Sequence, residues 1–501
     1  MEFILGIDIG TGSTKAVAVG MDYAAIGSSQ YFYPTSSPLP GYSEQNPELI
    51  WEAFQQSIRE LVSTLKSGPL AISLSTAMHS LIAVDEHCNA LAPMITWADS
   101  RSTGIADNLL RADTGKMLYR ITGTPVHAMS PLCKIIWIRE NQPELFKKTF
   151  KFISIKEYIW YRIFRTFEID HSIASCTGLM DVQHLRWSEV ALAAAGISTE
   201  QLSDLVSSSY CRSDFNPQQS LPFLAAGTPF VMGASDGCLA NLGTGAVSPG
   251  HAALTIGTSG ALRVAGDRAV LNEEAMTFSY RLDEKTFING GPVNNGGVAL
   301  KWHLKNVFQK DILTDHDYGL ALGGAAAVAP GAEGLIFSPY LQGERAPVWN
   351  SKSCGTFFGM RLHHHTPHFT RAVLEGICFA LNDVLLSLEA SGQEIVQLNV
   401  SGGFVTAELW LQILADITGK NLFLAATEDA SAIGAAYIAF KAIGLTEDYP
   451  LPDSQKGRLI LPDGITHQVY RSYFVIYKKL YQQLKGLMTE LDLIGEQNYK
   501  S

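Results

Sequence analysis

The chain has 501 residues, of which 47% are hydrophobic and 17% are charged, and its formal net charge is -11. This composition is typical of a globular protein, and the length predicts two large domains because single cores rarely grow beyond about 300 residues. The acidic balance argues against a nucleic-acid-binding protein, since contact with a phosphate backbone requires a basic surface.

The first residues, 1–5, lack the basic start of a signal peptide. No apolar run in the chain approaches the roughly 18 residues that are needed to cross a membrane. We therefore expect a cytoplasmic protein without a membrane partner.

A pattern near the N-terminus recurs in the middle of the chain. Residues 3–19 and residues 252–265 each consist of an apolar run, a polar glycine-rich turn and a second apolar run. Mixed helix and strand signals follow each copy, which favours α/β layers. The sequence therefore predicts two related α/β domains, and we place them at residues 1–247 and 248–501.

The first of these turns, residues 10–15, has the spacing of neither a Walker A loop nor a dinucleotide fingerprint. It offers backbone N–H groups, hydroxyls and one lysine, which can bind phosphate oxygens while Asp8 holds Mg²⁺ through water. A simple Gly/Ser hairpin with a solvated lysine is the alternative. The similar turn at Gly257-Thr258 favours a clamp for a polyphosphate, because ligands often bind where two such halves meet.

Asp236 follows the short apolar run 230–233 and precedes a predicted helix. A carboxylate at this position can take the proton of a hydroxyl during phosphoryl transfer. Its alternative role is that of a helix N-cap, which aspartate often fills.

Two long segments, residues 129–141 and residues 355–375, resemble the signatures of the FGGY carbohydrate kinases, and the resemblance extends from Asp8 to about Ala439. It implies an α/β, two-domain, actin-like (ribonuclease H-like) ATPase fold with the active site in the interdomain cleft. It also implies an enzyme that transfers the γ-phosphoryl group of ATP, with Mg²⁺, to a small sugar or sugar acid. A homodimer is left open.

The resemblance assigns roles position by position, and Asp236 resembles the catalytic base, which also contacts the substrate. The residues implied in ATP and phosphate binding are Thr11, Gly12, Ser13, Lys15, Gly257, Thr258, Gly297, Lys301, Gly402 and Gly403. The residues implied in substrate binding are Met78, His79, Trp97, Asp99 and Arg101.

Within the family, segments 77–82 and 95–102 are most similar to gluconate kinases, which predicts conversion of D-gluconate to 6-phosphogluconate. Arg101 can receive the gluconate carboxylate as a bidentate partner, unless it serves an internal carboxylate such as Asp99. Xylulose kinase is the alternative inside the family. A non-catalytic actin-like ATP switch or sugar sensor is the alternative outside it, because fold alone does not fix function.

Overall fold

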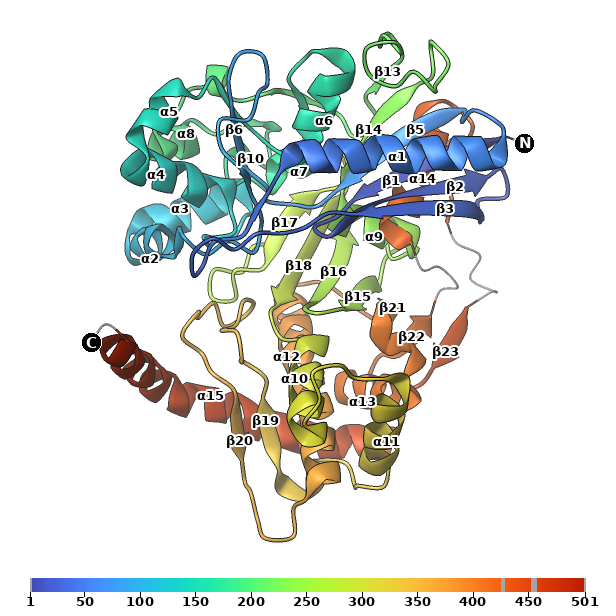
Figure 1. Cartoon of the computed structure of the whole chain (residues 1–501). Coiled ribbons are helices and arrows are strands. Elements are labelled where there is room, and N and C mark those ends of the chain that lie inside the picture. The colour runs from blue at the N-terminus through green and yellow to red at the C-terminus, as the bar shows by residue number, and fades with distance from the viewer. Residues whose placement is uncertain (1, 425–428, 452–456, 500–501) are drawn as a thin grey trace.

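The computed structural model describes residues 2–424, 429–451 and 457–499, and its two main sheets lie one above the other in Figure 1. The first sheet has six strands in the order β13-β14-β5-β1-β2-β3. Their bounds are β1 Phe3–Ile9, β2 Ser13–Gly20, β3 Ala25–Phe32, β5 Ala71–Thr76, β13 Cys211–Arg212 and β14 Phe230–Ser235.

The second sheet has seven strands in the order β17-β18-β16-β15-β21-β22-β23. Their bounds are β15 His251–Ile256, β16 Gly260–Gly266, β17 Phe278–Arg281, β18 Phe287–Val293, β21 Gln397–Ser401, β22 Asn421–Leu424 and β23 Arg458–Ile460.

The two sheets repeat one strand pattern. In the first, β1 pairs antiparallel with β2 and parallel with β5, β2 continues antiparallel to β3, and β5 continues parallel to β14. In the second, β15 pairs in the same way with β16 and β21, which continue to β18 and β22. The structure therefore contains the two related α/β halves that the repeated sequence pattern predicts.

Helices cover both sheets and fill a lobe beside the first one (Figure 1). In the first half of the chain they are α1 Pro47–Leu65, α2 Thr103–Arg111, α3 Asp113–Thr122, α4 Pro131–Asn141, α5 Pro143–Lys148, α6 Ile155–Phe164, α7 His171–Ser175, α8 Glu189–Ala195 and α9 Asp236–Gly243. In the second half they are α10 Gly297–Phe308, α11 Asp315–Ala326, α12 Thr366–Ala390, α13 Glu408–Thr418, α14 Ala430–Ala442 and α15 Gly464–Tyr499. Across the described ranges, none of the helices has the length and apolar character that a membrane span requires.

Helix α14 comes late in the chain but packs on the first sheet, against β1, β5 and helix α9 (Figure 1). Its alanines share one buried cluster with Ile4, Val17 and Leu239. The contact is very close, because a Cβ added at Gly6 would lie 1.8 Å from the carbonyl oxygen of Ala432. The division at residue 247 stays a prediction. Helix α14 lies after it in the sequence but packs on the sheet that is formed before it.

We expect Gly6→Ala to destabilise the protein strongly, because the new methyl group meets a helix carbonyl that cannot move without displacing α14. Overpacking of this kind costs about 1–3 kcal/mol or more of unfolding free energy. The measurement is the urea midpoint of each variant. Gly68→Ala is the matched control, since nothing lies within 4 Å of an added Cβ there. Equal midpoints for the two variants would contradict the close packing.

Candidate active site

Two glycine turns, one from each sheet, meet at a single cavity. The first joins β1 to β2 and is closed by a hydrogen bond from the Gly10 N–H to the Ser13 carbonyl, at 3.0 Å. The second joins β15 to β16 and is closed in the same way between Gly257 and Ser259, at 2.9 Å. Residues of both turns line a cavity of about 290 Å³. The two halves of the chain thus offer similar turns to one space.

Several predicted phosphate-side residues surround the second turn rather than the cavity itself. The Gly297 N–H, at the start of α10, donates to the Gly257 carbonyl at 2.7 Å. Gly402 has a φ of 105°, and a Cβ added there would lie 2.2 Å from the carbonyl oxygen of Ile256, at the end of β15. Gly403 follows at the surface, and Lys301 is exposed on α10.

Two aspartates stand at the carboxyl ends of β1 and β14, two parallel strands that flank β5. Asp8 lies near the end of β1, and Asp236 directly follows β14 as the first residue of α9. The Ser75 hydroxyl donates to Asp8 at 2.7 Å. Burial and then the charge of Asp236 raise the pKa of Asp8 to about 7. Burial also raises the pKa of Asp236, and the charge of Arg263 opposes that rise.

Lys15, at the end of the first turn, is engaged by a protein carboxylate. Its Nζ lies 2.5 Å from Asp429 Oδ1, immediately before α14. The side chain does not line the cavity, although its charge lowers the pKa of Asp8. The ion pair connects the first turn to the helix that crosses between the halves.

His79 presents a neutral acceptor to the cavity. Its Nδ1 lies 2.7 Å from the carbonyl oxygen of Cys176, and because a carbonyl can only accept, Nδ1 carries the proton. Its Nε2 is therefore unprotonated, and it lies 3.5 Å from the Tyr280 hydroxyl. Burial lowers the pKa of His79 to about 3, so the ring is uncharged at neutral pH.

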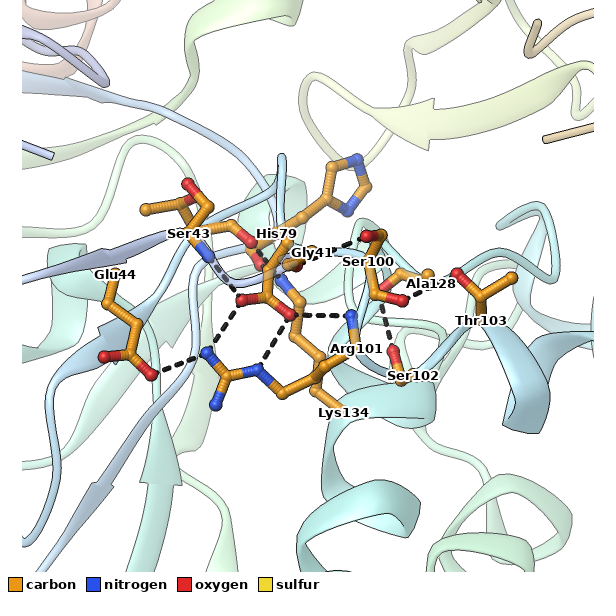
Figure 2. A network of polar contacts seen from close by, with 12 residues as sticks. Gly41, Ser43, Glu44, His79, Ser100, Arg101, Ser102, Thr103, Ala128 and Lys134 are labelled. Carbon is orange, nitrogen blue, oxygen red and sulfur yellow. Dashed lines mark hydrogen bonds and ion pairs between the residues drawn. The ribbon is translucent and has the colours of Figure 1, made fainter. Parts of the chain in front are cut away.

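The backbone of His79 adopts a left-handed conformation with a φ of 65°, which is costly for a residue with a side chain. The buried ammonium of Lys134 donates to the His79 carbonyl at 2.5 Å and to the Thr96 carbonyl at 2.8 Å (Figure 2). Burial lowers the pKa of Lys134 to about 7. Lys134 belongs to the first family signature, and its role here is to hold the loop that carries His79.

Trp97 connects the wall formed by Met78 and His79 to the first turn. Its indole N–H donates to the Thr11 hydroxyl at 2.9 Å. The cavity is lined by Thr11, Met78, His79, Trp97 and Asp236, together with Gly257 of the second turn. Six of the residues expected from the sequence are therefore brought together.

Arg101 and Asp99 are arranged differently from that expectation. The Arg101 guanidinium donates to Asp99 at 2.8 Å and to Glu44 at 2.6 Å, and it lies 3.7 Å from the ring centroid of Tyr42. Figure 2 shows Arg101 turned toward Glu44 and away from the ring of His79. Its side chain is 4% exposed and does not line the cavity. The Arg101 guanidinium, which was expected to receive a substrate carboxylate, is thus bound by two carboxylates of the protein, as the alternative interpretation of the sequence allows.

Other residues of the cavity wall were not expected from the sequence. They include Met129, Arg263, Tyr280 and Arg345. Met129 lies just before α4, Arg263 lies on β16, Tyr280 lies on β17 and Arg345 lies in a loop. These segments are far apart in the chain, so no local spacing in the sequence connects them.

The chain is similar to known proteins over nearly its whole length. Residues 3–243 match the model of the N-terminal domain, and residues 252–443 that of the C-terminal domain, of the FGGY family of carbohydrate kinases. A gluconokinase of Bacillus subtilis (strain 168) is 38% identical over 98% of each chain. A xylulose kinase of the same organism is 29% identical over 98% of this chain and 99% of its own.

Solved structures are similar over the whole fold. The crystal structure of a gluconate kinase from Lactobacillus acidophilus has a TM-score of 0.92 and 31% identity, covering 98% of this chain and 99% of that one. A ligand-bound xylulose kinase from the same organism has the same TM-score and identity, covering 98% and 100%. The predicted two-domain, actin-like α/β fold is confirmed, and the chain belongs to the FGGY family of carbohydrate kinases.

Proposed function

We propose that the protein transfers the γ-phosphoryl group of ATP to D-gluconate and forms 6-phosphogluconate. The observation that carries this proposal is the single cavity in which two phosphate-type turns meet Asp236 and the acceptor on His79. The higher identity to a gluconokinase, 38% against 29% for a xylulose kinase, supports gluconate over xylulose.

In this proposal Asp236 acts as general base. The substrate hydroxyl oxygen attacks the γ-phosphorus while its proton passes to Asp236, and the bond from the γ-phosphorus to the bridging oxygen breaks to release ADP. A raised pKa favours this proton uptake. His79 Nε2 and the Tyr280 hydroxyl would orient the other hydroxyls of the substrate.

The two turns would hold the phosphates, because their backbone N–H groups and hydroxyls suit phosphate oxygens. On the first turn we assign this role to Thr11, Gly12, Ser13 and Lys15, and on the second to Gly257 and Thr258. We place the nucleotide beyond the second turn, where Gly297 and Gly402 pack and where Lys301 and Gly403 lie at the surface. A cytoplasmic location and a homodimer stay predictions.

Mg²⁺ would bind beside Asp8, where the chemistry of the residues fits a cation. The charges of Asp236 and Asp429 both raise the pKa of Asp8, so a divalent cation would relieve the repulsion among these carboxylates. Residues 2–424, 429–451 and 457–499 contain no group of three or more side chains that could hold a metal. Phosphate oxygens and waters would therefore supply the remaining ligands, as Mg²⁺ often requires.

The first test is substrate preference. We expect kcat/KM for D-gluconate to exceed that for D-xylulose by at least about tenfold, which corresponds to roughly 1.4 kcal/mol of differential transition-state binding. The measurement is ADP release by the purified protein with each compound. A tenfold preference for xylulose would replace gluconate by the alternative sugar. No ADP release with any sugar or sugar acid would favour the non-catalytic ATP switch or sugar sensor.

The second test removes the proposed base. Asp236→Asn should lower kcat by about 100-fold to 10,000-fold while binding of ATP and gluconate is kept, because general-base catalysis contributes on that order. Asp315→Asn is a matched control, since Asp315 is likewise the first residue of a helix, α11, but is exposed and far from the cavity. If the Asp236 variant keeps half of its turnover, Asp236 is not the base.

The third test uses Asp8, whose folded pKa of about 7 lies above the ordinary aspartate pKa of 3.8. A raised carboxyl pKa means that the ionised form destabilises the fold, so this penalty grows as pH rises from the unfolded pKa toward the folded one. Asp8→Asn should therefore raise the melting temperature at pH 8, and by less at pH 5.5, while it lowers turnover. Thermal unfolding at both values checks this. A variant less stable than the wild type at pH 8 would contradict it.

A further inference from the structure

We propose that Arg263 and Arg345 bind the carboxylate of a sugar-acid substrate and so select acids over neutral sugars. This inference rests on the proposed function, and it names the residues that give the reaction its substrate class. Arg263 lies on β16 and Arg345 in the loop before Pro347, and both line the cavity that also contains Asp236 and His79.

Both arginines have hydrogen-bonding capacity that the protein does not use. The Nε of Arg263 and the Nε of Arg345 are buried and have no hydrogen-bond partner. Arg345 is 8% exposed, and its Nη2 donates to the Val293 carbonyl at 3.2 Å. Buried polar groups are almost always paired, so two unpaired guanidinium N–H groups on one cavity indicate a missing acceptor.

The protein compensates their charges only in part, because the charges of Asp236 and Glu344 oppose the burial that lowers the pKa of Arg263 and of Arg345. Within the part of the chain that the structure describes, neither guanidinium forms an ion pair with a carboxylate. Glu344 is adjacent to Arg345, but its carboxyl accepts from the backbone N–H groups of Asn294 and Arg345 and from the side chain of Asn295. Burial lowers the pKa of Arg345 to about 10, and the charge of Arg263 contributes in the same direction.

Three other buried cations are each paired with a carboxylate. Lys156 pairs with Asp170 at 2.8 Å, Arg371 pairs with Glu375 at 2.8 Å, and Arg101 pairs with two carboxylates. Unpaired buried charges are costly, and an anionic ligand would offset that cost when it binds. Lys134 and Arg281 are also buried without an ion pair in the described residues, but backbone carbonyls accept from their N–H groups. The Nε groups of Arg263 and Arg345 have no such acceptor, and an anion that belongs to the substrate best explains this difference.

Two anions could reach this cavity, a substrate carboxylate and the γ-phosphate of ATP. The surroundings of the arginines favour the carboxylate. The Arg345 guanidinium lies 5.3 Å from the ring centroid of Trp97, and its charge contributes to the lowered pKa of His79. The Nε of Arg263 packs on Gly237 next to Met78, since a Cβ added at Gly237 would lie 2.9 Å from Arg263 Nε and from Met78 Cε. Both guanidiniums thus lie beside Met78, His79 and Trp97, the residues to which the sequence assigns substrate binding.

The arrangement suits recognition of a carboxylate in particular. A guanidinium offers parallel N–H groups that match the two oxygens of a carboxylate, and two guanidiniums can share one such group. A neutral polyol of the same length would leave both cations desolvated and unpaired. Discrimination should therefore arise from the penalty on neutral substrates as well as from attraction to acids.

The experiment compares gluconate with D-glucitol, which carries a CH₂OH group in place of the carboxylate on the same carbon chain. Affinities are measured by calorimetry, and kcat/KM by ADP release, for the wild type, Arg263→Gln and Arg345→Gln. We expect each variant to lose about 30-fold or more in affinity and kcat/KM for gluconate, with KM for ATP nearly unchanged. The preference for gluconate over glucitol should shrink by the same factor.

Arg268→Gln is the matched control, because Arg268 is an exposed residue just beyond the end of β16. Thermal unfolding of every variant checks folding. Arg263→Lys and Arg345→Lys keep the charge without the planar fork, so they should retain part of the preference for gluconate if a Gln variant fails to fold.

Equal losses for gluconate and glucitol, or a raised KM for ATP with intact gluconate binding, would overturn the inference in favour of phosphate binding. If the wild type phosphorylates gluconate and both Gln variants do so equally well, the inference is overturned and the proposed function stands. If the wild type fails to phosphorylate gluconate but binds other hexonates through these arginines, the inference holds and the gluconate assignment fails.

Discussion

The close packing of α14 on β1 is the constraint on which the active site depends. At Gly6 the helix backbone approaches the strand so closely that no side chain fits between them. The same helix follows Asp429, which pairs with Lys15 at the end of the first turn. A segment from the second half of the chain thus fixes the carboxyl end of β1. The two glycine turns can face one cavity because this contact holds their sheets together.

The sequence predicted the features that depend on local pattern. Each glycine turn lies between two apolar runs, so its position follows from residues that are neighbours in the chain, and Asp236 is found where a strand signal meets a helix signal. The packing of α14 and the convergence of Arg263, Tyr280 and Arg345 depend on contacts between distant segments. No period or spacing encodes such contacts, so the cavity wall became visible only in the folded chain.

Arg101 illustrates why residue type and motif position are insufficient. The resemblance implies that its motif is a substrate-side segment, and an arginine there would suit a carboxylate ligand. In the fold, however, Asp99 lies two residues away and Glu44 reaches the same guanidinium from the short strand β4 Glu44–Gln45. The ion pairs tie this strand to the loop that follows β7 Met94–Ile95. The charge of Arg101 therefore stabilises the protein structure, and Arg263 and Arg345 are the arginines that line the cavity.

The neutral state of His79 changes how a pH–rate profile of this enzyme should be interpreted. An ionisation near pH 7 is commonly assigned to histidine, because that is the only side chain with an unperturbed pKa in this region. Here the imidazole titrates near pH 3, whereas Asp8 and Lys134 both have a pKa of about 7. A kinetic transition at neutral pH would therefore point to a group such as Asp8 near the first turn, or Lys134 beneath the loop that carries His79, and not to the imidazole. A change of pH near neutrality would alter the charge of the residues that support the cavity, while the imidazole that faces the cavity keeps one protonation state.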